Sequence, residues 1–71
     1  MNTTSISVAV NGHTRQVPHA TTVAQLLTEL DTAGKRVAVE RNGEIVPKSQ
    51  HDSTKLSSGD RLEIVIAVGG G

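Results

Sequence analysis

Two Asn-Gly dipeptides, Asn11-Gly12 and Asn42-Gly43, limit more than any other feature the folds open to this chain. Each follows a segment, 5–10 or 37–41, in which apolar residues alternate with small or polar ones. A period of two is typical of a strand with one apolar face. Asn-Gly suits the two-residue type I′ turn, because both of its residues need a positive φ. The sequence therefore predicts two β-hairpins.

The rest of the sheet follows from the same alternation. The return strands are expected over 13–17 and 44–46, before Pro18 and Pro47, since proline cannot donate to a strand ladder. The last strand, 61–68, has the strongest pattern, with one apolar face made of Leu62, Ile64, Ile66 and Val68. We expect the first and last strands to lie at the centre of the sheet, because they are the most apolar.

One helix is predicted between the hairpins. Thr22 and Gln25 have the spacing of a capping box, and Gly34 provides a stop. Four apolar residues at helical spacing form a single stripe: Val23, Leu26, Leu27 and Leu30. In the polar loop 48–58, only Leu56 is expected to reach the core.

The order hairpin, helix, hairpin, loop, strand predicts an α+β fold of the β-grasp, or ubiquitin-like, type. A mixed sheet of four to five strands has the helix packed on one face. The rival is a ferredoxin-like fold, which needs a second helix near 48–58, where no long apolar period exists. We expect one domain over 1–68 and a flexible glycine tail over 69–71.

Size and composition exclude several classes of function. A chain of 71 residues has one small core, which favours a binding or carrier module over an enzyme with a deep pocket. Seven basic residues balance seven acidic ones, and aromatic residues are absent, so no nucleic-acid partner is expected. The longest apolar run has five residues, 64–68, so no membrane contact is expected, and without a secretory signal we expect a cytoplasmic protein.

No metal site is expected either. Cysteine is absent, and the three histidines lack the spacing of a metal-binding pair. We interpret His13, His19 and His51 as solvated surface residues, and we expect no bound cofactor.

The glycines Gly69, Gly70 and Gly71 directly follow the last strand and carry the chemistry that we expect. Without Cβ atoms they form a thin, supple segment that reaches about 10 Å beyond the sheet. Such a segment can bring the terminal carboxylate of Gly71 into a narrow channel of another protein. Adenylation there would allow a sulfur nucleophile to attack and leave a thiocarboxylate, provided that water is excluded.

The sheet face opposite the helix is the second candidate site. Its centre is expected to be mildly apolar, with Ala9, Ala38, Val65 and Ala67, and its rim charged or polar, with Ser7, Glu40, Arg61 and Glu63. A small apolar centre with a charged rim is typical of a transient docking face.

Four segments, 22–27, 37–47, 59–65 and 67–71, resemble the ThiS family of sulfur carriers in thiamine biosynthesis. The resemblance implies that an E1-like, ATP-using enzyme adenylates Gly71 and that the thiocarboxylate donates its sulfur on thiazole synthase. The chain departs from the family pattern at Ile66, where a polar residue or histidine is common, and in lacking a Phe before the glycines.

Three alternatives stay open from the sequence. The chain could carry sulfur for another pathway, such as molybdopterin or cysteine synthesis. It could be a ubiquitin-like modifier that forms isopeptide bonds with lysines. It could also be a structural adaptor, for which removal of the glycines would change nothing.

Overall fold

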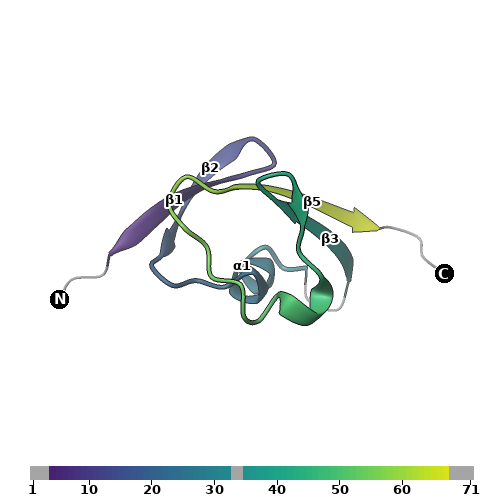
Figure 1. Ribbon diagram of the computed structural model, residues 1–71. Coiled ribbons are helices and arrows are strands. Elements are labelled where there is room, and N and C mark those ends of the chain that lie inside the picture. Colours follow the sequence, from purple (N-terminus) through teal and green to yellow (C-terminus); the bar gives the residue numbers. More distant parts are fainter. Residues whose placement is uncertain (1–3, 33–34, 68–71) are drawn as a thin grey trace.

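A computed structural model describes residues 4–32 and 35–67 of the chain (Figure 1). Five strands, one α-helix and one short 3-10 helix follow one another along the sequence: β1 (Ser5–Val10), β2 (His13–Pro18), α1 (Val23–Glu29), β3 (Arg36–Arg41), β4 (Glu44–Ile45), η1 (Lys48–Gln50) and β5 (Arg61–Ala67). No helix in these ranges has the length and apolar character needed to cross a membrane.

The strands form one mixed sheet in the order β2-β1-β5-β3-β4. β1 and β5 run parallel, and the remaining neighbours run antiparallel. Figure 1 shows α1 on one side of this sheet, with the other side left open. We call the open side the outer face. The predictions of a β-grasp fold and of an inner position for the first and last strands are confirmed.

Both Asn-Gly turns adopt the predicted backbone conformation. The φ angles are 51° at Asn11 and 84° at Gly12, and they are 53° at Asn42 and 87° at Gly43. Positive φ at both central residues gives the turn a twist that matches the flanking strands. The strands therefore pair directly beside each turn, Val10 with His13 and Arg41 with Glu44.

The N-terminus of α1 is closed by the predicted capping box. The Thr22 hydroxyl accepts a hydrogen bond from the Gln25 backbone N–H at 3.1 Å, and the Gln25 side chain accepts one from the Thr22 N–H at 3.0 Å. Two further helix N–H groups donate to loop carbonyls, from Val23 to Thr54 and from Ala24 to His51. The loop after η1 thus satisfies donors that a helix end leaves without intrahelical partners.

The helix ends before the predicted stop. Asp31 has a φ of 60° and donates its N–H to Thr28 O, while the Thr32 N–H donates to Leu27 O. This is the pattern of a Schellman motif with an aspartate at the left-handed position usually held by glycine. Gly34, the predicted stop, lies outside the described residues.

Eleven buried aliphatic side chains form the core between the sheet and α1: Ile6, Val8, Val10, Val17, Val23, Leu26, Val39, Val46, Leu56, Leu62 and Ile64. Leu56 is 4% exposed, as predicted for this member of the polar loop. The loop also contains η1, which the sequence analysis did not predict.

The prediction for His51 was wrong. Its side chain is only 8% exposed, and its Nε2 lies 3.1 Å from the carbonyl oxygen of Val46. This residue follows η1, whose turn directs the ring inward and the carbonyl of His51 toward α1. His13 and His19 are exposed, as predicted.

Candidate functional site on the outer face beside β5

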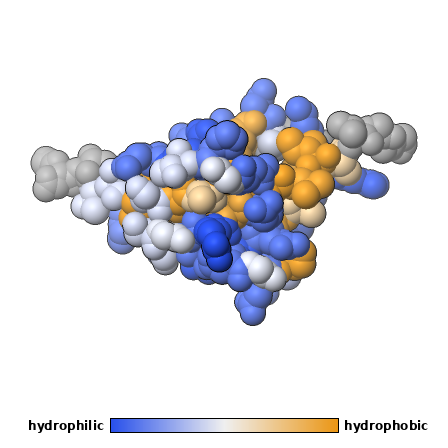
Figure 2. Space-filling model, turned by 90° about the horizontal axis from the view of Figure 1, so that it is seen from above, coloured by the Kyte–Doolittle hydropathy of each residue, from blue (hydrophilic) through white to orange (hydrophobic). Residues whose placement is uncertain are grey.

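Three small or apolar side chains lie together on the outer face near the end of β5. Ala38 pairs directly with Val65, and Ala67 follows two residues later on the same face. All three are exposed, and the exposed fraction of Val65 reaches 64%. We call Ala38, Val65 and Ala67 the docking patch, after the role that the sequence leads us to expect for them. Figure 2 shows the outer face, with hydrophobic surface gathered toward the C-terminal end and hydrophilic surface around it.

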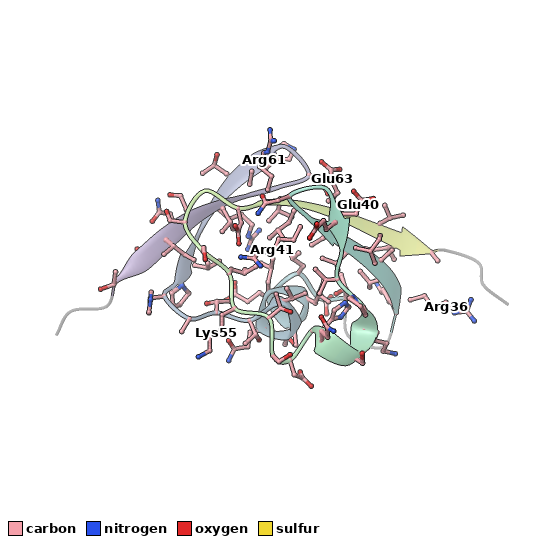
Figure 3. The ribbon with its side chains drawn as sticks, in the orientation of Figure 1. Arg36, Glu40, Arg41, Lys55, Arg61 and Glu63 are labelled. Carbon is pink, nitrogen blue, oxygen red and sulfur yellow. The ribbon has the colours of Figure 1, made fainter. Side chains whose placement is uncertain are left out.

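Charged residues border the docking patch, as the alternation predicted. Glu40 and Glu63 lie directly opposite each other across β3 and β5, and Arg61 is the next residue along the same face of β5. Figure 3 shows these three side chains standing on the outer side of the sheet. No ion pair among the described residues involves them. Two like charges directly opposite each other destabilise a pair of strands, so the Glu40–Glu63 pair does not stabilise the isolated domain.

The sequence predicts neither the place of Ile45 and Arg36 beside this region nor the exposure of Ile66, which is expected on the apolar face of β5. Ile45 is 64% exposed and pairs with Glu40, which places it on the outer face beyond the acidic pair. Arg36 pairs with Ala67 and borders the patch at its other end. Ile66 is 39% exposed although it alternates with the buried Leu62 and Ile64, because β1 pairs with β5 only as far as Leu62. Strand register decides all three positions.

A buried carboxylate fixes the loop that leads into β5. Asp60 is 5% exposed and accepts hydrogen bonds from Arg41 Nε at 2.8 Å, from the Ser57 N–H at 2.8 Å and from Asn42 Nδ2 at 3.1 Å. Burial raises the pKa of Asp60, but the hydrogen bonds from Ser57, Arg41 and Asn42, together with the Arg41 charge, outweigh it and lower the pKa below its ordinary value. The start of β5 is therefore held by a charged group that stays ionised.

The side chains of both turn asparagines bind the backbone of β5. Asn11 binds the N–H and the C=O of Ile64, and Asn42 Oδ1 accepts a hydrogen bond from the Arg61 N–H at 2.9 Å. Both residues are predicted only as turn residues, because no local pattern in the sequence indicates these long-range contacts.

Gly69, Gly70 and Gly71, the predicted carriers of the chemistry, lie outside the described residues. Within 4–32 and 35–67, no group of three or more His, Cys, Asp or Glu side chains is placed to hold a metal ion. The described part of the site is thus a surface beside the strand that leads toward these glycines.

A five-stranded mixed sheet in this order, crossed by one helix, defines the β-grasp, or ubiquitin-like, class of small domains. Comparison with solved structures agrees: the crystal structure of the thiamine biosynthesis protein ThiS from Geobacter metallireducens matches with a TM-score of 0.77 at 33% identity. The match covers 93% of this chain and 100% of that one.

Sequence comparison gives the family. The ThiS family profile matches residues 8–71. The sulfur carrier protein ThiS of Bacillus subtilis is 42% identical over 50 residues, which are 70% of this chain and 76% of that protein. A thiazole synthase of Paramagnetospirillum magneticum is 46% identical over 66 residues, 93% of this chain but only 20% of that protein, so the chain spans about a fifth of its length. The chain belongs to the ThiS family, and the relatives matched here are named a sulfur carrier protein and a thiamine biosynthesis protein.

Proposed function

We propose that the carboxylate of Gly71 is the group that carries sulfur. An E1-like enzyme would join this carboxylate to the α-phosphorus of ATP and release pyrophosphate. A sulfur nucleophile would then attack the acyl carbon and displace AMP. Hydrosulfide would give the terminal thiocarboxylate directly, whereas a persulfide donor would give an acyl disulfide that a thiol reduces to the thiocarboxylate, with formation of a disulfide on the donor side. The partner must exclude water during these steps, because the acyl adenylate is open to hydrolysis.

The extent of the family match is the observation that supports this proposal most strongly. It runs to residue 71 and so includes all three glycines. A segment without side chains would fit a narrow channel, which would give an enzyme access to the carboxylate. The domain itself would supply recognition, and the enzymes would supply the catalytic groups.

We further propose that a thiazole synthase receives the sulfur for the thiazole ring. Two proteins named thiazole synthase, from Paramagnetospirillum magneticum and Magnetococcus marinus, contain a segment similar to this chain that makes up 20% of their length. A shared polypeptide raises the effective concentration of one unit at the other. This supports a thiazole synthase as the partner of the present chain.

Both enzymes would recognise the outer face. In this proposal Val65, Ala67 and Ala38 form the apolar centre of the contact, and Arg61 and Glu63 form its rim. The opposed Glu40 and Glu63 carboxylates favour a partner with a cationic group, which would relieve their repulsion. Rim charges of this kind change the association rate more than the affinity.

Intact-protein mass spectrometry tests the proposed chemistry. The chain is incubated with an E1-like adenylating enzyme, ATP and a sulfur donor, beside a variant that lacks Gly71. We expect the full chain to gain the mass of a terminal oxygen-to-sulfur exchange, and we expect no such gain in the variant. Circular dichroism of the variant should match that of the full chain, because the deleted residue lies beyond β5.

Two outcomes would contradict the proposal. Sulfur transfer to the variant without Gly71 would show that another group carries the sulfur. Conjugates with lysines of other proteins, without a thiocarboxylate form, would favour a ubiquitin-like modifier instead.

A further inference from the structure

Asn11 holds β5 at one residue through both ends of its side-chain amide. Its Oδ1 accepts a hydrogen bond from the Ile64 N–H at 2.7 Å, and its Nδ2 donates one to the Ile64 carbonyl oxygen at 3.0 Å. The two residues are 53 positions apart in the sequence. A hairpin turn therefore makes a two-point contact with the central strand of the sheet.

The Asn11 side chain substitutes for a further residue of β1, which would otherwise pair with β5 at Ile64. β1 pairs with β5 at Ala9 and Val10, and the Asn11 N–H still donates to Leu62 O at 2.9 Å before the chain turns toward β2. The backbone groups of Ile64 face the same edge of β5 as Leu62 O, and the Asn11 amide supplies one donor and one acceptor to them. An asparagine amide has the same hydrogen-bonding groups as a peptide unit.

Ile64 is the last described residue of β5 that is held from both sides. Residues 65–67 pair with β3 along one edge, and no described strand pairs with their other edge. β5 is therefore held on both edges as far as Ile64. From Val65 of the docking patch onward, it is held along one edge only.

We propose that Asn11 is a positioning residue for sulfur transfer. By holding Ile64, it fixes the direction in which β5 runs past the docking patch, up to the last described residue, Ala67. This inference rests on the proposed function. It assigns to a residue remote from Gly71 a part in presenting that carboxylate to the enzyme, because small errors in orientation lower the rate of a reaction strongly.

Asn42 provides a matched control. It occupies the same place in the second Asn-Gly turn, with φ of 53° against 51° for Asn11, and its side chain also makes two hydrogen bonds. Its contacts lie at Asp60 and Arg61, where β5 begins. Asn11→Gly and Asn42→Gly both keep a residue that tolerates positive φ, and each removes two hydrogen bonds.

Amide hydrogen exchange tests the contact without any partner. In Asn11→Gly we expect exchange at Ile64 to become about tenfold faster relative to Val8 and Leu26 in the core. In Asn42→Gly this ratio should stay near that of the unchanged chain. Should the Gly variant fold poorly, Asn11→Asp retains the acceptor for the Ile64 N–H but sets a carboxylate oxygen against the Ile64 carbonyl, and the same local acceleration is expected. An equal response of Ile64 in the Asn11 and Asn42 variants would overturn the proposal.

Adenylation kinetics test the positioning role. With the E1-like enzyme, Asn11→Gly should lower kcat roughly threefold to tenfold and leave KM for the carrier nearly unchanged, because the docking patch is intact. Asn42→Gly should keep kcat. Unchanged kcat in Asn11→Gly, despite faster exchange at Ile64, would overturn this inference alone. Failure of the unchanged chain to be adenylated would instead overturn the proposed function, and this inference would fall with it.

Discussion

At the scale of single residues, Asp60 makes the stability of the fold depend on pH. The folded state lowers the pKa of this carboxyl, whereas the unfolded chain keeps an ordinary value of about 4. The unfolded state therefore binds the proton more tightly, and the stabilisation is complete above about pH 4 and lost as the pH falls through the folded-state pKa. We expect Asp60→Asn to lower the free energy of unfolding at pH 7 by about 1.5–3 kcal/mol.

Urea denaturation at pH 7 and at acidic pH checks this expectation. The difference in free energy of unfolding between Asp60→Asn and the unchanged chain should shrink as the pH falls. Asp52→Asn is the control, because Asp52 is exposed and should have little effect at either pH. Equal pH dependence in both variants would show that the contacts of Asp60 contribute nothing specific.

Asp60 and His51 also show that the burial of a single polar residue could not be predicted from the sequence. No pattern in the sequence predicts a buried charge at Asp60, and His51 is predicted to be a surface residue, yet each is less than 10% exposed. The partners of Asp60 include Arg41, which lies 19 residues away, and the orientation of His51 depends on η1. A charged or polar residue is buried where the tertiary fold supplies partners, and local patterns do not contain that information.

At the scale of elements, α1 depends on its cap and on packing. Its seven residues make about two turns, and a helix this short is unstable alone in water. Thr22→Ala removes the hydroxyl that accepts from the Gln25 N–H, so we expect a loss of about 1 kcal/mol in the free energy of unfolding, measured by thermal or urea denaturation.

Thr28→Ala is the matched control within α1. The Thr28 hydroxyl is exposed and donates to Ala24 O, a contact that does not help a helix, and alanine has the higher helix propensity. This variant should be neutral or slightly more stable. A loss equal to that of Thr22→Ala would mean that the capping box has no special contribution.

Elements with strong local signals could be predicted from the sequence, and those that depend on remote contacts could not. The hairpin turns and the capping box follow from residue types at fixed spacing, and both are confirmed. The return strand expected over 44–46 is shorter, Glu44–Ile45, because Val46 turns into the core. The 3-10 helix η1 and the helix stop at Asp31 rest on contacts that a single segment does not specify.

At the scale of the whole molecule, β5 joins three properties in one strand. It is the central strand of the sheet, its inner face carries Leu62 and Ile64 of the core, and its outer face carries Val65 of the docking patch. The alternation of the sequence was enough to assign both faces. It could not identify Ile45 and Arg36 as neighbours of the patch, because the register of β3 with β4 and β5 is set by the assembled sheet.

The extent of the docking patch can be measured with two residues of equal exposure. Val65 and Ile45 are each 64% exposed on the outer face, but Glu40 separates Ile45 from Ala38 and Val65. Val65→Asp places a carboxylate inside the patch beside Glu63, so we expect its affinity for a thiazole synthase, measured by calorimetry, to fall about tenfold or more. Ile45→Asp should lower the affinity less, since Ile45 lies at the border of the docking patch and not within it.

Stability separates a docking effect from a folding effect. Because both side chains are exposed, each substitution should lower the free energy of unfolding by about 1 kcal/mol or less, the range of strand propensity. Global unfolding of Val65→Asp would mean that Val65 belongs to the core. An equal loss of affinity in both variants would extend the contact across Glu40 to β4, and unchanged affinity in Val65→Asp would remove the outer face from the proposed recognition.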